Sequence, residues 1–77
     1  HADQQLMYKD LILMIRELPA TYRTIFSLYV IDGYNHVEIA SLMSISEGTS
    51  KSGLFRARAI LQTKIKVWEE EAYAIER

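Results

Sequence analysis

The chain has 77 residues, of which 49% are hydrophobic, 25% are charged and none is cysteine, and its formal net charge is −1. This length suffices for one domain near the lower size limit of a self-sufficient core, and the lack of cysteine excludes disulfides, thiolate metal sites and thiol nucleophiles. No apolar run approaches the roughly 18 residues of a membrane span, and the slightly negative charge argues against a domain that binds nucleic acid by bulk electrostatics alone.

Charge is unevenly distributed along the chain. Residues 51–66 contain five basic residues and no acidic one, whereas residues 69–77 contain four glutamates and a single arginine. A basic segment of this kind can serve as a local contact surface for phosphates even when the whole chain is nearly neutral. The distribution of charge is therefore more informative than its sum.

The first predicted helix covers residues 4–17, with Asp3 as its N-cap. Apolar residues recur at helical spacing along one face of this segment, at Met7, Leu11, Met14, Ile15 and Leu18. Pro19, the only proline, ends the helix and suits the first turn of the next one. We therefore expect a first helix with one buried face.

The second and third predicted helices cover residues 20–32 and 36–43. The second has an apolar stripe at Tyr22, Ile25, Phe26, Tyr29 and Val30. Gly33 fits its C-terminal stop, because glycine readily adopts the left-handed backbone found there. Asn35 and Glu38 form a capping-box pattern at the start of the third helix, and we interpret His36 as a residue of this capping region rather than a ligand.

The last predicted helix is the longest and covers residues 46–70. Ile45 suits the apolar position that a tight turn between helices buries, and Ser46 is a suitable N-cap. At roughly 100° per residue, the face that we expect to be buried collects Ser50, Leu54, Ala57, Leu61, Ile65 and Trp68. The opposite side carries Gly48, Ser52, Phe55, Arg56 and Ala59.

The third and fourth predicted helices have the layout of a helix-turn-helix. A turn of about three residues joins them, Ala40 lies inside the first, and small or polar residues open the second. Such an opening lets a backbone approach the bases in a major groove, with the N–H groups of the helix directed at phosphate oxygens. We predict an all-α, four-helix domain over residues 1–77 that contains a helix-turn-helix and no winged element.

A series of short motifs in a fixed order extends over most of the chain. In order, they are Leu18-Pro19-Ala20-Thr21-Tyr22-Arg23-Thr24-Ile25-Phe26, Tyr29-Val30-Ile31-Asp32-Gly33-Tyr34, Glu38-Ile39-Ala40, Ile45-Ser46-Glu47-Gly48-Thr49-Ser50-Lys51-Ser52 and Arg56-Ala57-Arg58. In this order and spacing the chain resembles region four of the extracytoplasmic-function (ECF) sigma factors, a group within the sigma-70 family that directs RNA polymerase to selected promoters. The resemblance covers about residues 6–65.

The resemblance implies a function and a set of partners. In that family, region four contacts the upstream (−35) promoter element through its last helix and docks on the flap of the polymerase β subunit, while a separate region two acts on the downstream element. The implied partners are double-stranded promoter DNA, the RNA polymerase core and an anti-sigma factor, with no cofactor, metal or small-molecule substrate. Because the sequence begins at His1 and lacks a secretory leader, we expect a fragment of a longer, cytoplasmic protein.

The candidate DNA-binding residues lie at the start of the last helix. The resemblance places the following positions where the family contacts bases and phosphates: Glu47, Gly48, Thr49, Lys51, Ser52 and Arg56. Arg58 is a flanking candidate, and Ser46 and Phe55 belong to the same segment.

Three positions depart from the pattern of the family. The turn has Ser44 where the family often has glycine, so Ser44 must accept a positive φ. Gly53 replaces a larger polar or basic residue, and Phe55 replaces a small polar one. We expect both changes to weaken the base-contacting surface, and Gly53 also costs roughly 1 kcal/mol of helix propensity relative to alanine.

Several candidate residues also have an ordinary structural interpretation. Glu47 is explained by the helix dipole alone, which contributes roughly 0.3–1 kcal/mol, or accepts a hydrogen bond from a cytosine amino group. Lys51 and Arg56 are either solvated charges or phosphate contacts. Hydroxyl groups in a first turn, as at Thr49 and Ser52, often bond their own backbone. Phe55 could pack on thymine methyls, a partner protein or another chain.

Two other functions remain as alternatives, and catalysis is not one of them. Serine and histidine occur without the context of a catalytic triad, no glycine-rich phosphate loop is present, and the two histidines stand far apart. One alternative is the output domain of a response regulator, which would bind paired half-sites as a dimer. The other is a protein-interaction module that binds polymerase or an anti-sigma factor without touching DNA.

Overall fold

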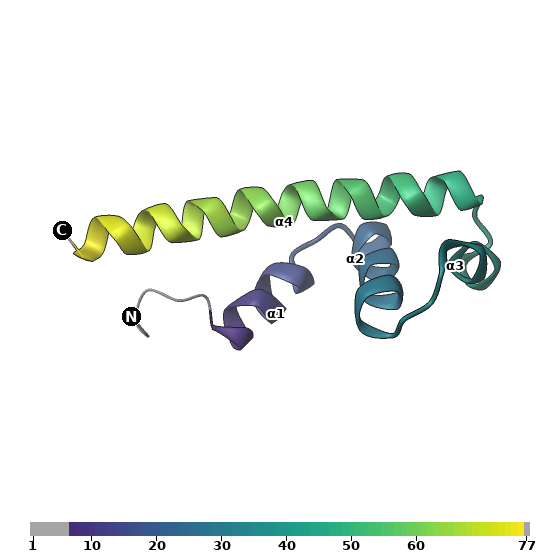
Figure 1. The fold of residues 1–77 in the computed structure, drawn as a ribbon, viewed down its shortest axis with the longest axis horizontal. Helices are drawn as coiled ribbons and strands as arrows, with labels where there is room; N and C mark the ends of the chain where they lie inside the picture. Colours follow the sequence, from purple (N-terminus) through teal and green to yellow (C-terminus); the bar gives the residue numbers. More distant parts are fainter. Residues whose placement is uncertain (1–6, 77) are drawn as a thin grey trace.

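The computed structural model describes residues 7–76, and all its regular structure is helical. The elements are α1 (Tyr8–Arg16), α2 (Ala20–Phe26), a π-helical segment η2 (Ser27–Ile31), α3 (His36–Met43) and α4 (Glu47–Glu76). Helix α4 spans the length of the molecule, and the other helices lie along one side of it (Figure 1). The molecule is accordingly elongated, at 49 × 18 × 15 Å. The all-α prediction is confirmed for the described residues.

Helix α1 begins later than predicted. Met7 is its N-cap and has an extended backbone with ψ 150°, so the helix starts at Tyr8 and not at residue 4. The Met7 carbonyl accepts the first backbone hydrogen bonds of the helix, including one of 3.1 Å from the Leu11 N–H. The predicted N-cap, Asp3, lies outside the described residues. The apolar spacing includes Met7 itself, so spacing alone did not mark the boundary.

The second predicted helix is interrupted by a change of helix type. Residues 20–26 are α-helical, but the following turn is π-helical, with the Asp32 N–H donating to the Ser27 carbonyl at 3.0 Å. The wider turn rotates the last residues of the segment outward, so Tyr29 and Val30 are exposed instead of continuing the buried stripe. Gly33 then ends the segment at φ 81°, as predicted.

Helix α3 and the turn after it follow the sequence signals closely. The Glu38 N–H donates to Asn35 Oδ1 at 2.8 Å and the Asn35 N–H donates to Glu38 Oε1 at 2.9 Å, which confirms the capping box. Ser44 takes the left-handed conformation, at φ 56°. This conformation reverses the chain within three residues and lets Ile45 pack against the core.

Helix α4 extends six residues beyond the predicted end at residue 70. No glycine or proline follows Glu70, and its neighbours Glu71, Ala72 and Tyr73 are compatible with a helix, so nothing local stops it. At 1.5 Å per residue, this helix accounts for the long dimension of the molecule. Its first half forms the helix-turn-helix with α3, and its second half lies beside α1 (Figure 1).

Two buried clusters hold the other helices against α4. Ile25 of α2, Ile39 of α3 and Leu54 of α4 form the cluster beneath the helix-turn-helix. The second cluster joins α1 to the middle of α4 and contains Ile15, Leu18, Ala57 and Leu61. The buried face predicted for α4 is therefore correct at its central positions.

Gly53 has a packing role that the sequence did not indicate. It is buried on the face of α4 that contacts α2, and a Cβ atom placed on it would overlap Cδ1 of Ile25. We had expected the glycine at this position to weaken the exposed base-contacting surface. Instead, Gly53 is buried and allows α2 and α4 to approach closely. The helix-propensity cost of Gly53 is offset by contact with a fully buried isoleucine.

We expect Gly53→Ala to destabilise the domain despite alanine's higher helix propensity. The gain of about 1 kcal/mol in propensity is smaller than the cost of about 1–3 kcal/mol for forcing a methyl group into a packed core. Urea unfolding followed by circular dichroism should show a net loss of up to roughly 2 kcal/mol. Gly48→Ala is the matched control, because an added Cβ there meets only Ser46 Oγ at 3.9 Å, and it should not destabilise.

A second substitution identifies the atom responsible. Ile25→Val removes Cδ1, so it should cost less in the Gly53→Ala background than in the unmodified chain, where the loss is roughly 0.5–1.5 kcal/mol. Additive effects of Ile25→Val and Gly53→Ala would show that the overlap does not limit stability.

Candidate nucleic-acid interface

The beginning of α4 is fixed by a cap on the helix-turn-helix side. Ser46 Oγ accepts a 2.9 Å hydrogen bond from the Thr49 N–H, which confirms the predicted N-cap. The Ser46 hydroxyl also donates to Thr49 Oγ1 at 2.8 Å. Glu47 and Gly48, whose N–H groups have no partner within the helix, are exposed. This end of the helix thus presents polar backbone groups at the surface.

All nine candidate DNA-binding residues are exposed. Between them on the same helix, Ser50, Gly53, Leu54 and Ala57 are buried against the other helices. The first three turns of α4 therefore have a fully packed face and a free face. The structure brings the candidates together on one continuous free surface.

The free face of α4 has a central strip and two basic flanks. At roughly 100° per residue, Gly48, Ser52 and Phe55 lie within about 60° of one another in the centre. Lys51 and Arg58 lie on one flank, and Arg56 lies on the other, more than about 120° away from them. A helix in a major groove has a phosphate backbone on each side of it, and a helix with this layout would direct positive charge toward both backbones if it lay in such a groove.

Two contacts engage polar candidates within their own helix. Glu47 Oε2 lies 3.4 Å from Lys51 Nζ in an exposed i,i+4 ion pair, a contact that is worth little in solvent. Ser52 Oγ donates to the Thr49 carbonyl at 3.2 Å. In the DNA-free chain, the Ser52 hydroxyl therefore bonds the backbone of its own helix, as the structural interpretation of these hydroxyl groups predicted. Both contacts involve exposed groups, so a phosphate or base edge can replace either of them at small cost.

Phe55 stands out from the central strip, with 74% of its surface exposed. Its neighbours on the strip, Ser52 and Ala59, are small, so the ring projects beyond the surface around it. It does not fold against the described part of its own chain. The structure leaves it free to contact either a base or another protein.

Three contacts near the interface were missed by sequence reasoning. A 2.8 Å hydrogen bond joins His36 Nδ1 of α3 to Ser50 Oγ of α4. The imidazole also stacks on the Tyr29 ring, with centroids 4.6 Å apart and planes inclined by 22°. Arg58 Cζ lies 6.0 Å from the centroid of the same tyrosine. The only sequence signal was the polar Ser50 on an otherwise apolar face.

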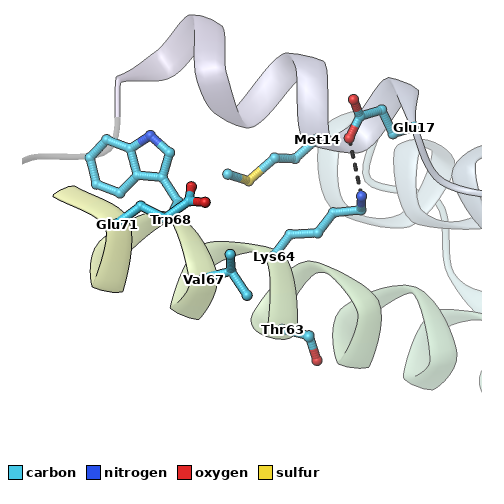
Figure 2. A pocket seen from close by; sticks show the side chains of 7 residues that line it. All are labelled: Met14, Glu17, Thr63, Lys64, Val67, Trp68 and Glu71. Atoms are coloured by element: carbon cyan, nitrogen blue, oxygen red, sulfur yellow. Dashed lines mark hydrogen bonds and ion pairs between the residues drawn. The ribbon is translucent and has the colours of Figure 1, made fainter. Parts of the chain in front are cut away.

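A second exposed feature is the groove between α1 and the later part of α4. It has a volume of about 300 Å³. Figure 2 shows Met14 extending from α1 toward Trp68 of α4, while Lys64 pairs with Glu17 at 3.1 Å. Val67 of α4 also lines this groove. The groove lies on the opposite part of α4 from the basic flanks, so the two surfaces can be occupied independently.

Comparison with known proteins assigns these features to a family. Residues 8–61 match the family described as Sigma-70, region 4. The chain is 46% identical over 46 residues to the ECF RNA polymerase sigma factor SigM of Bacillus subtilis, which covers 60% of this chain and 28% of that protein. It is 35% identical over 52 residues to the ECF RNA polymerase sigma-E factor of Haemophilus influenzae, covering 68% of this chain and 28% of that protein.

A third relative shows the same partial coverage. The ECF RNA polymerase sigma-E factor of Escherichia coli (strain K12) is 36% identical over 52 residues, which cover 68% of this chain and 27% of that protein. The chain thus spans little more than a quarter of the length of these relatives. No solved structure matches it significantly. Between residues 7 and 76, no helix has both the length and the hydropathy that crossing a membrane requires.

Proposed function

Because the chain belongs to the sigma-70 region 4 family, we propose that it binds the −35 element of a bacterial promoter through α3 and α4 as part of an RNA polymerase holoenzyme. Family membership confirms the predicted resemblance and the helix-turn-helix, and it identifies a transcription initiation module rather than an enzyme. It also favours this function over the output domain of a response regulator. The proposed setting is the bacterial cytoplasm, where promoter DNA and polymerase meet.

The observation that carries the proposal is the layout of the free face of α4. Its central strip is small and polar apart from Phe55, so a backbone can approach base edges there. Lys51 and Arg58 on one flank and Arg56 on the other are proposed to contact the two phosphate backbones. Salt-dependent affinity follows from these contacts, with a log–log slope of roughly −3 to −5 for three to five phosphates.

Phe55 is proposed to contact the methyl group of a thymine in the groove. An exposed aromatic ring among small residues gains from covering an apolar group, and the thymine C5-methyl is the apolar group that the major groove offers. The ring projects from the same strip as Ser52, so it would reach the bases and not the phosphates.

Selection from a random duplex library tests DNA recognition by the chain. After several rounds at low salt, the recovered duplexes should share a short motif that contains at least one thymine. Replacing that thymine with deoxyuridine removes only the methyl group and should weaken binding, and this effect should vanish in Phe55→Ala. Recovery of unrelated sequences, with affinity unaffected by Arg56→Ala, would favour the interaction module that does not touch DNA.

Docking on polymerase is proposed for the other end of the molecule. The groove between α1 and α4 is mainly apolar, with Met14, Val67 and Trp68 in its lining, and Tyr8 and Leu13 are exposed on α1. An apolar groove with a charged rim suits an amphipathic helix from a partner. We assign it to the flap of the polymerase β subunit, with an anti-sigma factor as a competing occupant.

A further inference from the structure

The strongest unexplained feature is the row of contacts that leads from the core to Arg58. It passes through Ser50 of α4, His36 at the start of α3, Tyr29 of η2 and the Arg58 guanidinium. These four residues come from three different elements that meet behind one basic flank of α4. Because each side chain in this row contacts the next, the buried end can fix the orientation of the exposed Arg58 guanidinium.

Ser50 anchors the row. It is fully buried, and it is the one polar side chain in that state among residues 7–74. A buried hydroxyl needs a hydrogen-bond partner, because leaving it unpaired forfeits the solvation it had in water. The His36 imidazole provides one at 2.8 Å. Because the two residues belong to α3 and α4, this bond also fixes the two helices of the helix-turn-helix relative to each other.

Tyr29 connects this anchor to the surface. Its ring stacks on the half-buried His36 imidazole at 4.6 Å, so the ring cannot turn freely. The π-helical turn makes this contact available, because an α-helical continuation would direct Tyr29 to the core instead. The wide turn of η2 thereby acquires a role in placing Tyr29 beside His36.

Arg58 is the exposed end of the row. Its guanidinium lies 6.0 Å from the Tyr29 ring centroid, at the outer limit of a cation–π contact. An arginine free of such a contact samples many rotamers, and ordering them on binding costs affinity. Arg58 lies seven residues after Lys51, hence within about 20° of it around the helix axis. The ring therefore holds the guanidinium on the flank that already carries Lys51.

We propose that Tyr29, held by His36 and Ser50, is a positioning residue for DNA binding, because it orients Arg58 toward a phosphate before the duplex arrives. This inference rests on the proposed function, since it supplies a reason for the orientation of a DNA-contacting side chain. Tyr29 itself does not contact the phosphate. Tyr29 affects the affinity for DNA only by orienting Arg58.

A double-mutant cycle on the full chain tests the inference, with the duplex recovered by library selection as the probe. Tyr29→Leu removes the ring and should weaken binding by roughly two- to fivefold, the range of an exposed cation–π contact. In the Arg58→Ala background the same substitution should have no further effect. Tyr29→Phe keeps the ring and should restore the affinity. His36→Asn keeps a hydrogen-bonding atom but loses the stacking ring, so it should act like Tyr29→Leu.

Nuclear magnetic resonance of the DNA-free chain provides the second readout. The Arg58 Nε–H proton should show a ring-current shift in the unmodified chain and in Tyr29→Phe, and lose it in Tyr29→Leu. Equal weakening of binding by Tyr29→Leu with and without Arg58 would overturn the inference, because it would make Tyr29 merely structural. Unchanged binding in Tyr29→Leu would also overturn it. If the unmodified chain binds no duplex at all, the proposed function fails and this inference fails with it.

Discussion

Replacing Lys51, Arg56 and Arg58 together with alanine should weaken duplex binding by at least roughly 100-fold at low salt. The three side chains are exposed on the two flanks of the free face of α4, where a groove-bound helix meets both phosphate backbones. A hydrogen bond to a charged group contributes on the order of 1.5 kcal/mol, and each 1.4 kcal/mol is about a factor of ten in affinity. Three lost contacts therefore dominate the affinity of a small domain.

The salt dependence separates lost contacts from a general loss of charge. Fluorescence anisotropy at several salt concentrations should give a log–log slope that is smaller by roughly 2–3 in the triple variant, about 0.9 for each phosphate contact. The matched control replaces Lys9, Arg16 and Lys66, which are also exposed but lie outside residues 46–58. It changes the net charge equally and should bind nearly as well as the unmodified chain. Equal weakening in both variants would mean that α4 makes no specific contact.

Ile39→Ala should remove a large part of the stability of the domain. Ile39 is fully buried between α2 and α4 in the cluster beneath the helix-turn-helix. Truncating a buried isoleucine to alanine costs about 2–5 kcal/mol, whereas a domain of this length has a total stability on the order of 4–12 kcal/mol. Urea unfolding followed by circular dichroism should show this loss, and duplex binding should fall because α3 no longer holds the start of α4.

Leu42→Ala is the control for that substitution. Leu42 lies in the same helix but is 59% exposed, so its truncation should change the unfolding free energy by no more than about 0.5 kcal/mol. If Ile39→Ala proved as mild as Leu42→Ala, the cluster of Ile25, Ile39 and Leu54 would not be what joins α3 to the rest of the domain.

Signals that act over one or two helical turns were sufficient to predict much of the fold. The capping box of Asn35 and Glu38 depends on residues three positions apart, and it gave the start of α3 at the correct residue. The buried face of α4 follows from spacing along a single helix, and Ser50, Leu54 and Ala57 are buried as predicted. In each case the residues that determine the structure are close together in the sequence.

Features that depend on contacts between distant residues were not predictable in this way. The π-helical turn at Ser27–Ile31 has no local motif, and it exposed Tyr29, which the apolar spacing had assigned to the core. Gly53 was misinterpreted because the residue that requires a glycine there, Ile25, lies 28 positions earlier in the chain. The bond between His36 and Ser50 likewise joins two helices. Local spacing indicates which face is buried but not which atoms meet there.

The exposed residues of the site could be predicted as a set but not as individual contacts. The family resemblance placed the nine candidates at the start of α4, and all nine are exposed there. Their side-chain states depend on neighbours: Lys51 pairs with Glu47, whereas Arg58 lies near Tyr29 from another element. A helical wheel shows that Lys51 and Glu47 are neighbours on one helix, but it cannot show that Arg58 lies near Tyr29 of another element.

A titration of the isotope-labelled chain with the selected duplex, followed by nuclear magnetic resonance at low and moderate salt, tests promoter-DNA recognition by α3 and α4 most directly. We predict shifts confined to the start of α3 and to residues 46–58, which weaken as salt rises, while amides lining the groove between α1 and α4 stay unchanged. If residues 46–58 do not respond at low salt, while a polymerase β-flap fragment shifts residues that line the groove between α1 and α4, the chain is a docking module and the assignment of DNA binding to α4 is wrong.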